Sequence, residues 1–218
     1  MSSEEPQTDA QGFVLAGGRS SRMGSDKALV EFGGRPMMAH ALDILIRAGL
    51  AVAIAGARNQ LEVFAPVVPD ETPDLGPLGG VCAALEWARA RWSVFIPVDL
   101  PLLPPVVIRY LLDRARQSGA AVVVASANGF TETFPVAVDR VLRPELRAAL
   151  AEGRSGCQRE LRAAADKLGL PVAIVDLDEA VRAGALDASK ELPYESWFLN
   201  TNTKEELERA ESYWKSAD

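Results

Sequence analysis

A glycine-rich segment with three cationic side chains follows an apolar run near the beginning of the chain. The apolar run ends at Ala16, and residues 17–27 have the sequence Gly-Gly-Arg-Ser-Ser-Arg-Met-Gly-Ser-Asp-Lys, with Arg19, Arg22 and Lys27 as the cations. Glycine lets the backbone approach a phosphate closely, while exposed N–H groups and cations supply donors and charge. Because the whole chain carries a net charge of −7, this local positive charge indicates a small anionic ligand. The segment predicts a cradle for a nucleotide triphosphate.

This segment matches neither of two common phosphate-binding patterns. A Walker loop needs Lys after its last glycine, whereas Gly24 is followed by Ser25, and Arg19 stands where a dinucleotide fingerprint needs its second glycine. The alternative interpretation is a polar turn between a strand and a helix that happens to be basic. The three cations favour the anion site over that turn.

A single carboxylate stands at the end of an apolar strand pattern in the middle of the chain. Asp99 follows the apolar run 94–96 and precedes Leu100-Pro101, and ligands of open α/β sheets bind at the carboxyl ends of strands. Alone, Asp99 could equally cap the turn before the helix that begins near Pro104. Together with the cationic segment it predicts a Mg²⁺ ligand, because Mg²⁺ is usually held by one or two carboxylates and substrate phosphate oxygens.

The composition predicts a soluble, cytoplasmic protein with one sizeable core. The chain has 218 residues, 48% of them hydrophobic, and no apolar run approaches the ~20 residues that cross a bilayer. Its acidic charge argues against general binding to nucleic acid, and its polar beginning does not resemble a signal peptide. We expect residues 1–11 to be a disordered tail and residues 12–218 to be one domain. Cys82 and Cys157 lack any metal or disulfide spacing and are expected to be ordinary buried thiols.

Short apolar runs alternate with helical patterns along the chain, which predicts right-handed βαβ units and a mostly parallel sheet covered on both faces. Residues 12–126 form the expected nucleotide-binding half and residues 127–218 the expected acceptor-binding half. The segment 185–193 is expected to be a loop. Strands are predicted at 13–15, 52–55, 67–68, 94–96, 121–125, 134–138, 172–175 and 197–199, and helices at 36–47, 78–91, 104–117, 141–152 and 158–168.

Four blocks of the sequence, taken in order, resemble the nucleotidyltransferase superfamily and, within it, the molybdenum cofactor guanylyltransferases. The first is Leu-Ala-Gly-Gly-Arg-Ser-Ser-Arg-Met-Gly-Ser-Asp-Lys at 15–27, with Phe-Gly-Gly-Arg-Pro at 32–36. The second and third are Gly-Pro-Leu-Gly-Gly at 76–80 and Pro-Val-Asp-Leu-Pro at 97–101. The fourth is Asn-Thr-Asn-Thr at 200–203, followed by Glu-Glu-Leu at 205–207. The resemblance covers nearly everything after the first ten residues.

This resemblance implies an α/β, three-layer, Rossmann-like nucleotidyltransferase fold with a mostly parallel, mixed sheet. It also implies Mg²⁺-dependent transfer of GMP from GTP to the phosphate of molybdenum-bound molybdopterin, with release of pyrophosphate, and transient contacts with other proteins of cofactor synthesis. The implied catalytic residues are Arg19, Lys27 and Asp99, with Asp99 as the metal ligand. The implied nucleotide-binding residues are Leu15, Ala16, Gly17, Gly18, Arg19, Lys27, Asp70, Gly79 and Asp99, and the implied acceptor-binding residues are Asn200 and Asn202.

Two other functions stay open from the sequence. One is a cytidylyltransferase for the same acceptor or for another phosphorylated small molecule. Guanine is favoured over cytosine because residues 15–18 are Leu-Ala-Gly-Gly, where the cytidylyl branch tends to have Leu-Ala-Ala-Gly. The other is a noncatalytic nucleotide-sensing module, against which the joint presence of Arg19, Lys27 and Asp99 argues. A phosphate acceptor is already ionised, so no general base is needed.

Several positions have structural explanations or depart from the family. The only histidine, His40, lies within a helical pattern and is expected to be a packing or surface residue. Thr203 with Glu206 forms a capping box ahead of a helix, with Asn202 expected near the metal. Asn59 is the candidate for an asparagine that the family often carries after its second strand. The family also commonly has a histidine where Phe134 precedes Pro135.

Overall fold

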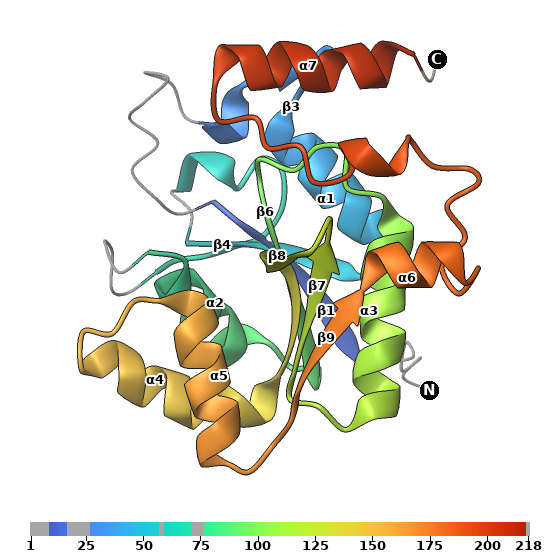
Figure 1. Cartoon of the computed structure of the whole chain (residues 1–218). Helices are drawn as coiled ribbons and strands as arrows, with labels where there is room; N and C mark the ends of the chain where they lie inside the picture. The colour runs from blue at the N-terminus through green and yellow to red at the C-terminus, as the bar shows by residue number, and fades with distance from the viewer. Residues whose placement is uncertain (1–8, 17–26, 57–58, 71–75, 217–218) are drawn as a thin grey trace, which may run out of the picture.

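A seven-stranded sheet with helices on both faces forms the frame of the molecule (Figure 1). The computed structural model describes residues 9–16, 27–56, 59–70 and 76–216. The strand order is β5-β4-β1-β6-β8-β7-β9. All neighbours run parallel except at β8, which is antiparallel to both β6 and β7. The strands are β1 (Ala10–Leu15), β4 (Ala51–Ala55), β5 (Val67–Val68), β6 (Trp92–Pro97), β7 (Val122–Ala127), β8 (Phe130–Asp139) and β9 (Val172–Asp176).

Two apolar clusters, one on each face of the sheet, hold the helices in place. Helices α1 (Met37–Arg47), α3 (Pro105–Ser118), α6 (Leu177–Arg182) and α7 (Lys204–Lys215) contribute buried residues to the first cluster. Helices α2 (Pro77–Trp87), α4 (Arg143–Ala151) and α5 (Cys157–Lys167) contribute to the second. Central strands have both faces covered in such an arrangement, and the burial of Val94, Phe95 and Ile96 on β6 agrees with it. The predicted three-layer α/β fold with a mixed sheet is therefore confirmed.

The order of the strands reverses direction beside β1. From β1 the chain passes through α1 to β4 and then to β5 on one side, whereas α2 returns it to β6 on the other side of β1. Ligands of open α/β sheets bind at the carboxyl ends of strands where the order reverses. Leu15 and Pro97, at those ends, are register partners. The topology therefore predicts a ligand site at the sheet edge where the cationic segment and Asp99 are expected from the sequence.

The structure differs from the sequence prediction in two places. Strand β1 begins at Ala10, which is buried, so the last two residues of the expected tail belong to the sheet, while residues 1–8 lie outside the described part. The predicted strand at 197–199 is wrong, because this segment is a turn after the 3₁₀ helix η4 (Tyr194–Ser196). Its apolar pattern arises from packing: Trp197 is fully buried and its Nε1–H donates to the Leu192 carbonyl at 2.7 Å.

Other differences concern boundaries and short elements. The predicted helix 141–152 is divided into a 3₁₀ turn, η3 (Arg140–Leu142), and α4, and the helix predicted to reach residue 91 ends at Trp87 because Ala88 has an extended backbone. Helix α6 and the hairpin of β2 (Glu31–Phe32) and β3 (Arg35–Pro36) were not expected. Within the described residues no helix is long and apolar enough to cross a membrane.

Both thiols are buried, as expected. Burial raises the pKa of Cys82 and of Cys157 to about 12, so both stay protonated and unreactive at neutral pH.

Helix α7 is fastened to the β2–β3 hairpin by aromatic rings. The Trp214 indole meets the rings of Phe32 and His40 edge-on, with centroids 5.7 and 5.2 Å away. His40 is buried and its Nε2–H donates to the Phe32 carbonyl at 2.8 Å. Burial lowers the pKa of His40 below its ordinary value, so the ring stays neutral at pH 7. His40 is therefore a packing residue, as predicted.

A pair of glycines allows a matched test of this anchor. Gly33 and Gly34 both have positive φ, but a Cβ on Gly33 would lie 2.7 Å from the Trp214 Nε1, whereas a Cβ on Gly34 would meet nothing within 4 Å. We expect Gly34→Ala to lower the free energy of unfolding by about 1 kcal/mol from backbone strain. Gly33→Ala should cost about 1–3 kcal/mol more because Trp214 must move. Urea unfolding measures both, and equal losses would contradict the anchor.

Candidate functional site

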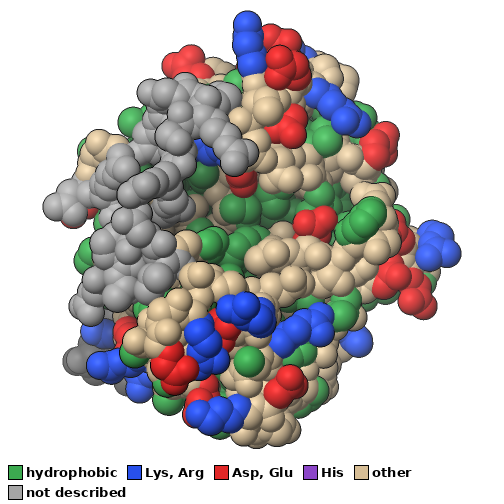
Figure 2. All heavy atoms as spheres, turned by 60° about the vertical axis from the view of Figure 1, so that its left-hand side comes forward, with side chains coloured by type: hydrophobic (Ala, Val, Ile, Leu, Met, Phe, Trp, Pro, Cys, Tyr) green, Lys and Arg blue, Asp and Glu red, His purple; other side chains and the backbone are tan. Residues whose placement is uncertain are grey.

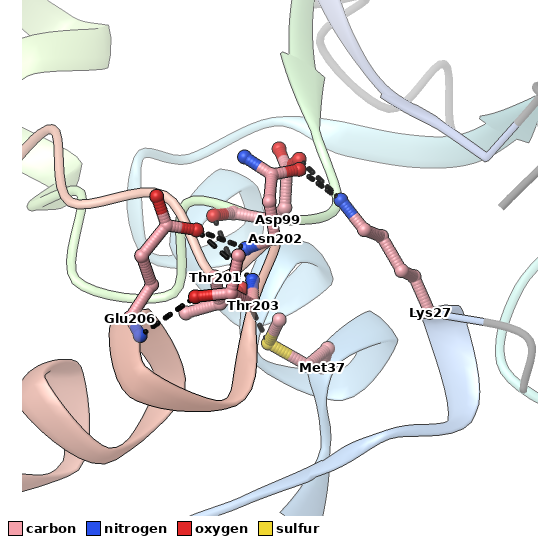
Figure 3. Close-up of polar contacts among 7 residues, drawn as sticks. All are labelled: Lys27, Met37, Asp99, Thr201, Asn202, Thr203 and Glu206. Atoms are coloured by element: carbon pink, nitrogen blue, oxygen red, sulfur yellow. Dashed lines mark hydrogen bonds and ion pairs between the residues drawn. The ribbon is translucent and has the colours of Figure 1, made fainter. Parts of the chain in front are cut away.

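Three polar side chains from distant parts of the chain meet at the carboxyl end of β6 (Figure 3). The Lys27 Nζ lies 3.0 Å from the Asp99 Oδ2, forming an ion pair. The same ammonium donates a hydrogen bond to the Asn202 Oδ1. Lys27 is separated from Asp99 by 72 residues and from Asn202 by 175. The structure thus brings together three of the residues that the sequence selected.

Asp99 is positioned by the sheet and by a backbone clamp. Strand β6 ends at Pro97, and Asp99 occupies the turn that follows. The Asp99 carbonyl accepts hydrogen bonds from Thr201, from its backbone N at 3.2 Å and from its Oγ1 at 3.3 Å. Thr201 is 1% exposed, so these bonds are shielded from water. The clamp fixes the segment that carries Asn202 against the turn that carries Asp99.

Asn202 is positioned by the cap of helix α7. The Glu206 Oε2 accepts from the backbone N–H of Asn202 at 2.8 Å and from that of Thr203 at 3.0 Å. The Glu206 N–H donates to the Thr203 Oγ1 at 3.2 Å, which completes the predicted capping box. Capping satisfies backbone donors that a helix start leaves free. Here the same carboxylate also orients the backbone of a site residue.

The Asp99 and Asn202 oxygens are suitable ligands for a hard cation. One carboxylate oxygen and one amide oxygen converge on the positive charge of Lys27. The Lys27 and Asp99 side chains are only 21% and 19% exposed, so the pair is screened less by solvent than a surface ion pair. Oxygen donors of these two kinds also bind Mg²⁺, which keeps further positions for water and phosphate oxygens. Among the described residues no group of three or more His, Cys, Asp or Glu side chains could hold a metal.

A second group of predicted residues meets at the start of helix α2. Asp70 follows β5, and its carboxylate lies so close to Gly79 that a Cβ there would overlap it. A Cβ on Gly80 would lie 3.2 Å from the Leu15 Cδ2 at the end of β1. The two glycines therefore let helix α2 approach the end of β1 and the residue Asp70 after β5 closely. Leu15, Asp70 and Gly79, all three predicted to bind nucleotide, thus lie close to the start of α2.

Other predicted residues are placed less fully. Gly17, Gly18 and Arg19 lie outside the described residues. Ala16 directly follows β1 and its N–H donates to the Ala55 carbonyl at 3.0 Å, and Asn200 is exposed beside the clamp. Figure 2 shows the molecule hollowed between the level of α7 and that of α4 and α5, with hydrophobic side chains on the floor of the hollow.

Thr201 was not predicted as a site residue. Its only signal was its position between the two predicted asparagines, which does not distinguish a side chain that faces a ligand from one that holds the backbone. Its hydroxyl donates to the Asp99 carbonyl, and it also lies 3.6 Å from the Met37 Sδ. Thr201 is therefore a positioning residue for the site.

Comparisons with known proteins show the family of the chain. The family model "MobA-like NTP transferase domain" matches residues 12–172. The chain is 36% identical over 150 residues to the molybdenum cofactor guanylyltransferase of Vibrio cholerae, covering 67% of this chain and 73% of the relative. It is 37% identical over 166 residues to the enzyme of the same name from Bordetella pertussis, covering 71% and 81%.

Solved structures share the fold at lower sequence identity. Molybdopterin-guanine dinucleotide biosynthesis protein A from Archaeoglobus fulgidus superposes with a TM-score of 0.75 at 20% identity, covering 94% of this chain and 99% of that chain. The 2-C-methyl-D-erythritol 4-phosphate cytidylyltransferase from Thermus thermophilus gives 0.63 at 18% identity, covering 93% and 98%. The matched segment, the identities and the sheet together show that this chain belongs to the MobA-like NTP transferase family.

Proposed function

We propose that the protein transfers GMP from GTP to the phosphate of molybdenum-bound molybdopterin in a Mg²⁺-dependent reaction that releases pyrophosphate. The observation that carries this proposal is the convergence of Lys27, Asp99 and Asn202 at the carboxyl end of β6. The names of the relatives supply the nucleotide and the acceptor. The net charge of −7 argues against nucleic acid as the ligand. The proposal also includes a cytoplasmic location and transient contacts with other proteins of cofactor synthesis.

The proposed chemistry depends on positioning and charge neutralisation. Nucleotidyl transfer needs in-line attack on the α-phosphorus, and well-oriented reactants together with fixed charges provide most of the acceleration. Lys27 and Arg19 neutralise phosphate oxygens, and the acceptor phosphate is ionised at neutral pH, so no side chain has to remove a proton from it. Asp99, with Asn202, would hold Mg²⁺, which when bound polarises phosphate oxygens and offsets their charge. Leu15, Ala16, Gly17, Gly18, Asp70 and Gly79 contact the nucleotide, and Asn200 contacts the acceptor.

Removing the charge of Asp99 tests the metal site. Asp99→Asn keeps the shape of the side chain, so the fold should persist, but turnover with GTP, Mg²⁺ and molybdopterin should fall by about 100-fold or more. Pyrophosphate release measures the rate. Asp166→Asn, an exposed substitution on α5, is the control and should leave the rate unchanged. Full activity of Asp99→Asn across a Mg²⁺ titration would refute the assignment.

Removing the charge of Lys27 tests the phosphate contact. An ammonium about 4 Å from a phosphate oxygen contributes on the order of 4 kcal/mol at an effective dielectric constant near 20, before desolvation is subtracted. We therefore expect Lys27→Met to raise the dissociation constant of GTP at least about tenfold, measured by calorimetry. Lys190→Met, at an exposed position in the 185–193 segment, should bind GTP like the unmodified protein. If Lys27→Met has the same dissociation constant for GTP as the unmodified protein, the proposed contact of Lys27 with phosphate is wrong.

A nucleotide panel separates the two candidate donors. The purified protein is given GTP, CTP, ATP or UTP with Mg²⁺ and molybdopterin, and pyrophosphate release is followed. We expect GTP to have the highest kcat/KM. A preference for CTP would replace the guanylyl assignment with a cytidylyl one while leaving the metal and phosphate contacts intact.

A further inference from the structure

Strand β8 contains a four-residue bulge next to the end of β6. Val124 on β7 lies opposite Val136 on β8, but Ser126, two residues later, lies opposite Thr131. One residue of β7 therefore faces four residues of β8, 132–135. Bulges of this kind re-aim side chains and occur next to active sites.

The bulge lies on the acceptor side of the proposed nucleotide site. Strand β6 pairs with β8 only as far as Phe95 opposite Val136, so the bulge begins where that pairing ends, and Asp99 follows Phe95 by four residues. Strands are about 4.8 Å apart. The bulge is thus about one strand spacing from β6, the strand that leads to Asp99. Strand β5, which leads to Asp70, lies on the opposite side of β6, about three spacings from it.

A half-buried carboxylate in the bulge has no counter-charge in the described structure. Glu132 is partly buried, and no hydrogen bond or ion pair joins its side chain to another described residue. Burial alone raises the pKa of Glu132 above its ordinary value, so no neighbouring described cation offsets it. Phe134, in the same bulge, packs against the core cluster beneath α2 and anchors the segment. An anchored, partly desolvated carboxylate in a bulge near the carboxyl end of β6 is suited to a ligand that brings its own donors.

The chemistry of such a ligand follows from the carboxylate itself. Two carboxylate oxygens match two parallel N–H donors. A 2-amino-4-oxo heterocycle presents that pair, an amino group beside a ring N–H, and both guanine and pterin rings have this edge. The position of the bulge, across Asp99 from Asp70 and Gly79, favours the ring of the acceptor over that of the nucleotide.

We propose that Glu132 is a specificity residue that accepts hydrogen bonds from the amino and ring N–H groups of the pterin acceptor. This inference rests on the proposed function for the identity of the acceptor. It adds a recognition contact on β8, separate from the residues that hold phosphate and metal.

A kinetic comparison provides the first test. Glu132→Gln keeps the size of the side chain but replaces one acceptor oxygen with a donor. We expect the KM for molybdopterin to rise about 10- to 100-fold, while the KM for GTP stays the same. Glu132→Asp, which keeps the carboxylate, should recover part of the loss, and Glu62→Gln, at an exposed position, should behave like the unmodified protein. An unchanged KM for molybdopterin, or a raised KM for GTP instead, would overturn the proposal.

A binding measurement makes the proposal independent of turnover. Free pterin is fluorescent, and its quenching by the purified protein gives a dissociation constant without GTP or Mg²⁺. We expect pterin to bind the unmodified protein about tenfold or more tightly than it binds Glu132→Gln, and guanosine to compete poorly. Equal binding by both proteins, no binding, or stronger competition by guanosine would overturn the assignment of Glu132. If the unmodified protein bound pterin but released no pyrophosphate from GTP, the proposed function would fail while the pterin site would stand.

Discussion

The ion pair of Lys27 with Asp99, shared with the Asn202 amide oxygen, is the contact on which the candidate site depends. It joins the last residue of the cationic segment, the turn after β6 and the segment before α7. Unpaired, partly buried charges would be costly at this edge. The ammonium satisfies both oxygen atoms, so a carboxylate oxygen and an amide oxygen converge on one positive charge.

The frame around that contact explains why residues so far apart in sequence can meet. Parallel strands end on a common edge, and the reversal of strand order beside β1 leaves room there. The clamp of Thr201 on the Asp99 carbonyl and the cap of α7 then bring the last site segment to the edge. The rings around Trp214 hold α7 on the β2–β3 hairpin, on the same side of the sheet. Packing far from the polar atoms thus determines where those atoms lie.

Much of the frame could be predicted from the sequence because its patterns are local. Apolar runs such as 94–96 give strands, the period of apolar residues in 104–117 gives α3, and the Thr203 box gives the start of α7. Trp197 misled the prediction, since a short apolar run on a turn that packs into the core has the same composition as a strand. The β8 bulge could not be predicted either, because register is a property of two strands and not of one.

Part of the candidate site could also be predicted from the sequence. Asp99 could be selected from its place at a strand end, and its partnership with Lys27 agrees with the pairing of β1 and β6. The choice of Asn202 came from family resemblance. The role of Thr201 could not be predicted, because it acts through a backbone carbonyl 102 residues away and leaves no local pattern. The roles of Gly17, Gly18 and Arg19 remain predictions, as do the two expected halves of the chain.

The cap of α7 has a consequence for biosynthesis of the protein. Asn202 gains its orientation from Glu206, four residues further along, and that glutamate is fixed only when the first turn of the helix has formed. A nascent chain that has completed β1 to β9 already contains the family's matched segment, yet it lacks one of the three groups at the edge of the sheet. Incomplete chains that end before α7 would therefore lack the Asn202 amide oxygen that contacts Lys27 at this edge.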